Sequence, residues 1–459
     1  MPTDRAAAQA AGVWAVLIVA AVLVGIPLRR SAKIGAPPLT GGLAVPNLAV
    51  AVVVLLGGVV LARWLPAWCE RVTWRRLLVG AALVAVGWGM SLALVRGPSG
   101  LDRGLSTRYE YPAVVDQVDR TGVGPFVDTF TDAEVLASYP IHIQGHPVGA
   151  ALVFVGLDRI GLGGAIGGAA AMLVASVATV PAVLVAVREV ADERLARRAA
   201  PFLVLAPAAI WTVTSADALY TAVGALAVLL VVLATHGSRP PLARAGFAVA
   251  GGVGFGLGIH LSYGLAPLVV VAVAVVVAQR RYAVLLGAAV GGAAVVGAFT
   301  ASGFWWFDGL AATHVRYLAG VASRRSYAYF TLLGNPAALA LALGPAAFVA
   351  VRLVRDRRLW LLAGAGLAAV AVSDLSGLSK AEVERIWLPF VPWVLVLAAG
   401  LPGCPSGARR VAVEGDGAGD GTLVAATPAD ATGGGIVGPL LIAQVVTAVA
   451  IESVVRTIW

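Results

Sequence analysis

The stretch DALYTAVGALAVLLVVLAT, residues 217–235, is continuously apolar and contains no charged side chain beyond Asp217. Roughly 20 such residues in a helix are needed to cross the hydrocarbon core of a bilayer. Inside hydrocarbon every backbone polar group must be hydrogen-bonded within the protein, so that only helices and closed barrels can span it. The apolar residues do not alternate with polar ones, which excludes a membrane barrel. The stretch therefore predicts a membrane-spanning helix.

The same pattern recurs along the whole chain, which has 459 residues, of which 59% are hydrophobic and only 12% are charged. A soluble domain usually carries about 25% charged residues, so this chain has too little polar surface to face water on all sides. Thirteen apolar runs are predicted as spans, at residues 7–28, 42–62, 77–95, 162–187, 199–215, 217–235, 245–262, 264–279, 282–303, 336–354, 359–374, 386–401 and 436–455. We expect an all-α, polytopic transmembrane protein of about 13 spans.

Short, arginine-rich connections between these runs indicate the orientation. They are residues 63–76, 188–198, 239–244, 280–281 and 352–358. The positive-inside rule places such connections in the cytoplasm. With thirteen spans they all fall on the side of the N-terminus, provided that residues 147–160 form a re-entrant or interfacial helix that does not cross. These arginines account for the net charge of +9, so binding to nucleic acid is not expected.

The spans and connections divide the chain into five parts. These are N-terminal membrane helices (1–95), an extracytoplasmic catalytic loop (96–146), a membrane core (147–401) with external loops at 301–335 and 374–386, a flexible cytoplasmic linker (402–435) and a C-terminal membrane helix (436–459). The linker is predicted from its Gly, Asp, Ala and Pro content. Cys69 and Cys404 are too few for a disulfide framework and are expected to be reduced, cytoplasmic thiols.

Acidic side chains gather in the long external loop 96–146. Long loops in membrane proteins either carry function or are disordered, and this one is rich in aromatic, acidic and histidine residues. A carboxylate held against the membrane surface is partly desolvated, which raises its pKa and lets it act as a general base. Glu110, between Tyr109 and Tyr111, is the leading candidate for such a base, with Asp116 in reserve. The alternative is that these acids are solvated loop charges.

Two histidines, His142 and His146, precede the return of this loop into the membrane. Their spacing of four residues without an intervening acid does not match a zinc-protease motif. A divalent metal such as Mg²⁺ or Mn²⁺ is one option, because clusters of histidine and carboxylate suit such ions. Hydrogen bonding of His146 to a substrate and a purely interfacial role are the others.

Later turns and loops on the same side add further candidates. Asp217 lies at a turn between two spans, where capping of the following helix is the alternative to a functional role. Arginine offers a planar fork and lysine a point charge to phosphate oxygens, and both suit a lipid phosphate. An aromatic belt with snorkelling cations is the structural alternative. The remaining candidates are His260, His314, Arg316, Lys380 and Arg385.

In this order, the motifs resemble those of the GT-C superfamily, which are membrane glycosyltransferases that use polyprenyl-phosphate sugars. The matching stretches are Tyr109-Glu110-Tyr111, His146-Pro147, Ser215-Ala216-Asp217 and Arg385-Ile386-Trp387-Leu388-Pro389. Members often have His-Pro-Pro at the second stretch. Here the acidic loop follows the third span rather than the first, which implies two added N-terminal helices. The phrase KAEVERIWLPF, residues 380–390, is similar to an envelope subfamily that includes a methylthioxylose transferase acting on lipoarabinomannan.

The resemblance implies an inverting enzyme of the cell membrane with its active site on the extracytoplasmic face. It would move a sugar, such as methylthioxylose, a mannose or a pentose, from a polyprenyl-phosphate donor to a hydroxyl of an envelope glycan or glycolipid. Glu110 would be the base and Asp116 the reserve. Side chains expected to bind the substrates are Tyr109, His146, Asp217, His260 and His314, with Arg316, Lys380 and Arg385 on the phosphate.

Two other classes of protein remain open on the sequence. A transporter or a flippase for lipid-linked sugars would place its ionisable residues near mid-membrane, within broken helices. In this sequence the ionisable residues cluster in the external loops instead. A non-catalytic membrane scaffold is the second alternative.

Overall fold

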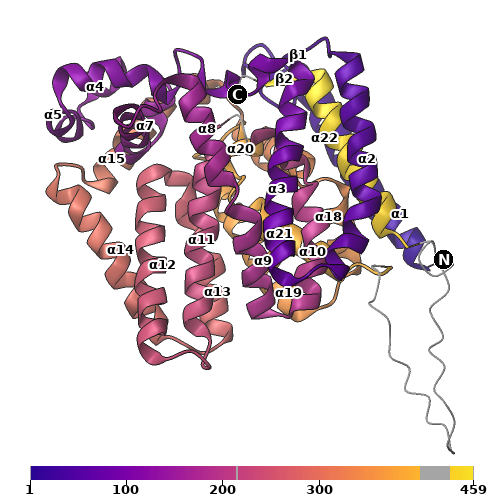
Figure 1. Cartoon of the computed structure of the whole chain (residues 1–459). Coiled ribbons are helices and arrows are strands. Elements are labelled where there is room, and N and C mark those ends of the chain that lie inside the picture. The colour runs from indigo at the N-terminus through magenta and orange to yellow at the C-terminus, as the bar shows by residue number, and fades with distance from the viewer. Residues whose placement is uncertain (1, 213–214, 404–434, 458–459) are drawn as a thin grey trace, which may run out of the picture.

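A computed structural model of the chain describes residues 2–212, 215–403 and 435–457. Cys404 and most of the predicted linker 402–435 therefore lie outside the described residues. Long helices form a bundle, and short helices gather at one end of it (Figure 1). The long helices are α1 (Pro2–Gly25), α2 (Leu48–Arg71), α3 (Trp74–Ala93), α11 (Asp217–Thr235), α12 (Pro241–Leu261), α14 (Ala283–Ala301), α19 (Arg357–Leu375) and α22 (Val437–Val454).

Shorter helices complete the bundle and build its capped end. Those in the bundle are α8 (Gly164–Ser176), α9 (Thr179–Val190), α10 (Glu193–Val204), α13 (Val269–Ala278), α17 (Asn335–Leu343), α18 (Pro345–Leu353) and α21 (Val391–Leu395). Those at the capped end, which we call the loop end, are α4 (Val115–Thr121), α5 (Val123–Asp128), α6 (Ala133–Ser138), α7 (Val148–Arg159), α15 (Trp306–Ala319), α16 (Tyr327–Tyr329) and α20 (Val383–Ile386). Two short antiparallel strands, β1 (Gly41–Leu43) and β2 (Val455–Thr457), pair there.

The class predicted from the sequence is confirmed. Among the described residues nine helices are long and apolar enough to cross a membrane, or ten if one bent pair is a single span. The count of thirteen is not confirmed, because the runs predicted at 199–215, 264–279, 336–354 and 386–401 form short or broken helices. In the third of these, α17 and α18 are bent by 94°. Gly344 lies between them with a positive φ, and the following Pro345 cannot continue a helical hydrogen-bond ladder.

The arginine-rich connections meet at the end of the bundle opposite the loop end, which we call the arginine end. The connections α11–α12 and α13–α14 lie there in Figure 1, and the N-terminus lies on the same side. Contacts between the connections are Arg197 to the Val72 carbonyl (2.8 Å), Arg358 to Asp192 (3.1 Å) and Arg239 to Glu189 (2.9 Å). This grouping matches the alternation of connections predicted from the sequence. That the arginine end is cytoplasmic stays a prediction.

Helix α7 covers most of the segment 147–160 that was expected not to cross. Its 12 residues give a length of about 18 Å at 1.5 Å per residue, which is too short for hydrocarbon of about 30 Å. It packs against α4, α8 and α12, and it lies with the loop helices in Figure 1. The short length supports the expectation for this segment.

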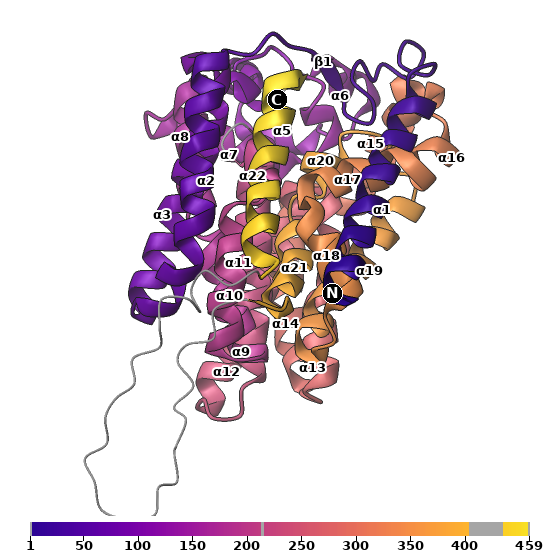
Figure 2. The same cartoon turned by 90° about the vertical axis from the view of Figure 1, so that its right-hand side faces the viewer.

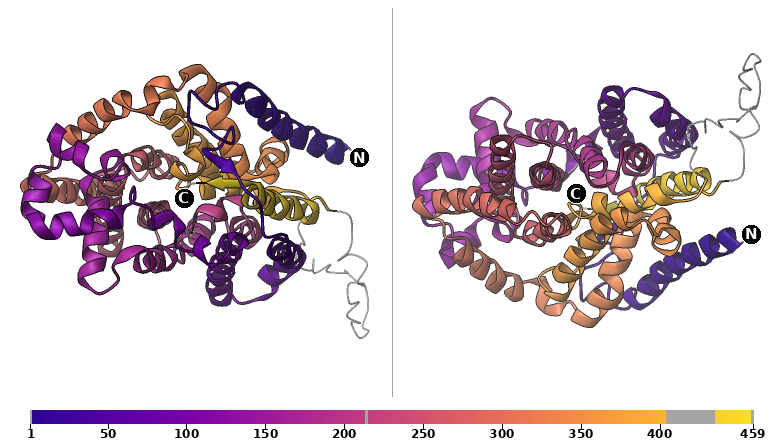
Figure 3. Two further views of the ribbon diagram at one scale, coloured as in Figure 1. Left: turned by 90° about the horizontal axis from the view of Figure 1, so that it is seen from above. Right: turned by 90° about the horizontal axis from the view of Figure 1, so that it is seen from below.

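The external loop 96–146 is folded and joined to the loop 301–335. Phe126, Phe130 and Tyr139 pack against one another with ring centroids 5.3–5.7 Å apart, and Phe304 of the later loop lies 5.8 Å from Phe130. This aromatic cluster holds the two loops together above the bundle. At the sides of the bundle, α22 lies between α2 and α18 (Figure 2), and α1 runs along the edge against α17 and α18 (Figure 3).

Candidate functional site

Glu110 and His142 are 32 residues apart in the external loop and contact each other. Pro112 starts a short 3₁₀ turn at Tyr111–Val114, so that Glu110 precedes it in an extended conformation with φ −96° and ψ 169°. The side chain of Glu110 is only 5% exposed, and its Oε1 lies 2.7 Å from Nδ1 of His142. The backbone amide of His142 also donates to the carbonyl of Tyr109 at 3.2 Å. Glu110 is therefore buried and held in one orientation.

Arg385 links this pair to Asp217. Nη1 of Arg385 lies 2.6 Å from Oδ2 of Asp217, the first residue of α11, and both side chains are buried. Its Nη2 lies 3.4 Å from Nε2 of His142 and 3.7 Å from Glu382. Burial opposes the charge on Arg385, but the carboxylates of Asp217 and Glu382 outweigh it and raise the pKa of the guanidinium above its usual value. Residues far apart in the sequence thus form one chain, Glu110–His142–Arg385–Asp217, which we call the buried network.

The two ring nitrogens of His142 face different partners. A guanidinium can only donate hydrogen bonds, so Nε2 of His142 must be the acceptor of its contact with Arg385. The other ring nitrogen, Nδ1, is the one that faces Glu110, 2.7 Å from its Oε1. His142 accordingly orients the carboxylate and leaves its second oxygen for another proton.

Aromatic rings and His146 form the wall beside the network. Tyr111 stacks on Phe154 with ring centroids 5.0 Å apart and meets the edge of His146 at 5.6 Å. Nδ1 of His146 lies 2.7 Å from the carbonyl oxygen of His142, and its ring lies 5.8 Å from that of Tyr220. Burial lowers the pKa of His146 to about 4, so that its ring is neutral at pH 7.

Glu384 is a buried carboxyl group that the sequence did not single out. It precedes Arg385 in α20 and is fully buried. Among the described residues neither of its carboxyl oxygens has a hydrogen-bond partner. Burial raises the pKa of Glu384 to about 8, so that the neutral acid predominates at pH 7.

Lys380 and Arg316 lie in the loops around the network and are already engaged. Nζ of Lys380 donates to the carbonyls of Ala322 (2.8 Å) and Arg325 (3.1 Å). Nε of Arg316 donates to Oε1 of Gln144, so that α15 is tied to the end of the loop 96–146. The structure thus joins the loop 301–335 to two of the three segments that carry the buried network, namely the loop 96–146 and the segment 374–386.

The other predicted site residues are placed elsewhere. Asp116 on α4 and His314 on α15 are exposed. Tyr109 is 43% exposed and accepts a hydrogen bond from Nη2 of Arg108 at 2.9 Å. His260 is buried in α12 and stacks on Phe299 with centroids 4.0 Å apart. Of the expected residues, the structure brings together Glu110, His146, Asp217 and Arg385.

His142 completes the network, although the sequence suggested for it only a metal or an interfacial role. Its position four residues before His146 was visible, but its partners on other segments were not. As to the metal option, within residues 2–212, 215–403 and 435–457 no group of three His, Cys, Asp or Glu side chains is arranged to hold an ion. The Mg²⁺ or Mn²⁺ option therefore gains no support.

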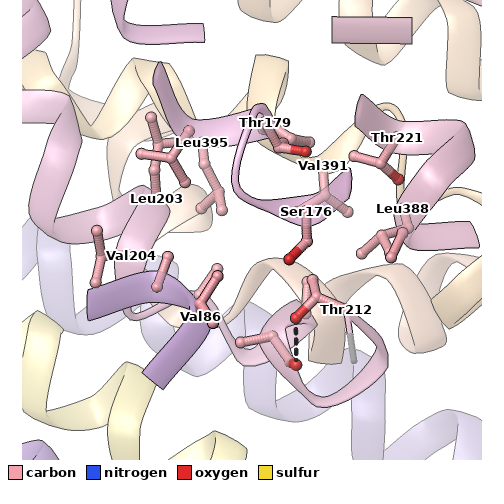
Figure 4. Close-up of a pocket in the computed structure, with 17 residues that line it drawn as sticks. Val86, Ser176, Thr179, Leu203, Val204, Thr212, Thr221, Leu388, Val391 and Leu395 are labelled. Carbon is pink, nitrogen blue, oxygen red and sulfur yellow. Dashed lines mark hydrogen bonds between the residues drawn. The ribbon is translucent and has the colours of Figure 1, made fainter. Parts of the chain in front are cut away.

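A small apolar cavity of about 60 Å³ lies next to the network, between α3, α9, α10, α11 and α21 (Figure 4). Its wall includes Leu388, whose amide donates to the Arg385 carbonyl at 2.9 Å. It also includes Thr221, whose hydroxyl donates to the backbone carbonyl of Asp217 at 2.7 Å. The cavity wall thus lies one helical turn from both members of the ion pair. The hydroxyl of Thr212 in the same wall donates to a backbone carbonyl, which leaves the lining apolar.

Comparisons with known proteins give limited similarity. No protein-family model matches the chain, and no curated protein matches it. Among solved structures, the crystal structure of ArnT from Cupriavidus metallidurans bound to undecaprenyl phosphate is similar, with 19% identity and a TM-score of 0.46. The apo state of the same protein has 19% identity and a TM-score of 0.45. The alignment covers 71% of this chain and 59% of that chain in both cases.

Proposed function

We propose that this chain is an inverting membrane glycosyltransferase. It takes a sugar from a polyprenyl-phosphate donor and passes it to a hydroxyl of an envelope glycan or glycolipid on the extracytoplasmic face. The observation that carries the proposal is the buried network, which lies one helical turn from an apolar cavity. A phosphate-linked sugar on a long apolar chain requires a base, a cation and an apolar groove together.

Glu110 is the base in this proposal. One oxygen of its carboxylate lies against Nδ1 of His142, and the other takes the proton of the acceptor hydroxyl. The acceptor oxygen then forms a bond to the anomeric carbon, while the bond from that carbon to the phosphate oxygen breaks and the lipid phosphate leaves with the electron pair. Direct displacement of this kind, with Glu110 acting as a base rather than a nucleophile, gives inversion. Asp116 remains the reserve because it lies on the following helix.

Arg385 is the cation that faces the leaving phosphate. Its firm contact is with Asp217 at 2.6 Å, and its weaker contact with Glu382 at 3.7 Å can be exchanged for phosphate oxygens. Lys380 uses two of the three donors of its ammonium group on backbone carbonyls, which leaves one for a ligand. Arg316 adds a third positive charge from α15, and the apolar cavity takes the part of the lipid next to the phosphate.

The finer identity follows only from the resemblance of residues 380–390 to the methylthioxylose transferase-like subfamily. On that basis the sugar is methylthioxylose, or else a mannose or a pentose, and the acceptor is a lipoglycan such as lipoarabinomannan. A panel of radiolabelled polyprenyl-phosphate sugars tests this. The purified full chain in nanodiscs is given each donor together with an envelope glycan extract, and transfer of label to the glycan is measured.

The matched control for this assay is Glu110→Gln, which keeps the shape of the side chain and removes the base. Transfer of label by the wild type and not by the variant supports the proposal. The transporter class would be supported by a different result. In that case wild-type protein in proteoliposomes would carry the labelled donor across the bilayer and would transfer no sugar from any donor of the panel.

A further inference from the structure

Helix α15 crosses the loop end of the bundle and contacts three different segments along its length. Nε1 of Trp306 donates to a backbone carbonyl in the last turn of α12 at 2.8 Å. The hydroxyl of Thr313 donates to the carbonyl of Gln144 at 3.2 Å, and the hydroxyl of Tyr317 accepts from the amide of Lys380 at 2.8 Å. All three partners lie at the loop end, so α15 lies across the end of the bundle and not along its long helices.

The opposite side of α15 carries an exposed apolar stripe. Phe307 is 59% exposed, Val315 is 71% exposed and Leu318 is 49% exposed. At 100° per residue these three side chains lie within about 80° of one another, on the side away from the three contacts described above. Asp308 and His314 are exposed as well and border the stripe on either side. The helix thus has one face fixed to the protein and one apolar face without a cover.

Helix α14 shows at which level of the membrane α15 lies. Its 19 residues give a length of about 28 Å, close to the thickness of the hydrocarbon core. Only 11% of its apolar stretch is buried, so most of its surface faces lipid. Four residues join it to α15, and the two helices lie at the left-hand edge of Figure 1. Trp305 in this connection is 41% exposed and lies 5.3 Å from the ring of Phe307, as expected of aromatic residues at the boundary between hydrocarbon and headgroups.

Three partners could meet the apolar stripe: water, another protein or lipid. Water is unfavourable, because each large apolar side chain gains free energy when it leaves water. A stable protein interface buries about 800 Å² on each partner, which is more than three side chains provide. A helix with an apolar side and polar borders is typical of the lipid headgroup region, where the apolar side enters the bilayer. The position of α15 directly after a lipid-facing span favours this third partner.

We propose that α15 lies in the membrane interface at the loop end and that Phe307, Val315 and Leu318 enter the bilayer surface. The partner of this face is the lipid surface itself. The inner face of α15 holds Gln144 through Thr313, so that the lipid-facing helix is tied to the turn between His142 and His146. The proposal does not depend on glycosyl transfer, because it concerns only what covers α15.

The accessibility of spin labels tests the proposal on the full chain in lipid nanodiscs. Val315→Cys, Val290→Cys and Arg120→Cys are made singly in a chain without Cys69 and Cys404, and each cysteine carries a nitroxide. Val290 is 64% exposed on α14 and is the hydrocarbon reference, while the exposed Arg120 on α4 is the water reference at the loop end. Power saturation measures collisions with oxygen, which dissolves in the bilayer, and with a water-soluble nickel chelate. Oxygen should dominate at positions 315 and 290, and the nickel chelate at position 120.

The proposal is overturned if the nickel chelate reaches position 315 as readily as position 120. It is also overturned if neither reagent reaches position 315, or if spin–spin broadening appears there, because a protein would then cover the stripe. A lipid with a photoactivatable group at headgroup level, applied to the wild type, covers the case in which a labelled variant does not fold. Its cross-links should include residues 305–318, and cross-links confined to other segments would refute the proposal.

Discussion

At the scale of the single residue, Glu110 has the clearest assignment. Because its carboxylate is buried and oriented by His142, Glu110→Gln should abolish sugar transfer while expression and donor binding stay nearly unchanged. General base catalysis is worth about 10²–10⁴-fold, so the rate of transfer should fall by that factor. Transfer to an acceptor glycan at saturating donor measures it. Asp116→Asn is the comparison, since Asp116 is exposed on α4. If that variant is inactive and Glu110→Gln is not, the base is Asp116.

Arg385 combines a structural contact with the proposed phosphate contact. Arg385→Lys keeps a positive charge beside Asp217 but loses the fork, so we expect weaker donor affinity with a small change in stability. Arg385→Gln leaves Asp217 buried without a cation, and loss of a buried partner typically costs about 3–5 kcal/mol of stability. Donor affinity and thermal unfolding, measured side by side, separate the two effects.

The control for Arg385 is Arg120→Lys, because Arg120 is an exposed arginine on α4 at the same end of the molecule. It should change neither donor affinity nor stability. The phosphate role of Arg385 is lost if Arg385→Lys leaves donor affinity as it is in the wild type. It is also lost if that variant unfolds the protein, because the arginine would then be needed for folding.

At the scale of the element, α20 buries an acidic and a basic side chain, Glu384 and Arg385, within one turn. Arg385 is ionised and Glu384 is a neutral acid at pH 7, and Glu382 and Arg325 are the other charged groups that act on Glu384. The pKa of Glu384 is raised by burial from an ordinary value near 4.5 to about 8. The contribution of Glu384 to the free energy of unfolding is therefore fully present below about pH 4.5 and is lost as the pH rises through about 8.

Glu384→Gln should remove this pH dependence, because the amide resembles the protonated acid and does not titrate. Relative to the variant, the wild type should lose stability between pH 5 and pH 9, by at most about 1.4 kcal/mol per pH unit. Thermal unfolding in detergent, followed by tryptophan fluorescence at several pH values, measures the difference. Parallel curves for the two proteins would show that Glu384 does not titrate in this range.

At the scale of the whole molecule, the two ends of the bundle should face opposite sides of the membrane. The arginine end gathers the arginine-rich connections and should be cytoplasmic, while the loop end carries the buried network. Single cysteines at Ser106 and Arg355, both exposed, are introduced in a chain without Cys69 and Cys404. An impermeant maleimide on intact cells should label position 106 only. Labelling of position 355 instead would reverse the orientation and place the network on the inner face.

The sequence by itself determined the class of this protein, because hydrophobicity is a local property that adds up along each run. Long apolar runs predicted a polytopic helical membrane protein, and nine helices in the described residues are long and apolar enough to span. Hydropathy does not report bending, so it predicts one straight span where α17 and α18 are bent by 94°. Its cause, Gly344 followed by Pro345, is nevertheless written in the sequence.

Only the tertiary structure decided how the candidate site is assembled. Residue type and position point to Glu110, His146, Asp217 and Arg385, but the sequence relates each of them only to its neighbours in the chain. Arg385 pairs with Asp217, 168 residues away, and His142 joins that pair to Glu110. Such pairing depends on which helix ends pack together at the loop end. A charged side chain can be buried only where the fold supplies a partner of opposite charge. No local pattern contains that information, so the roles of His142 and Glu384 become visible only in the folded chain.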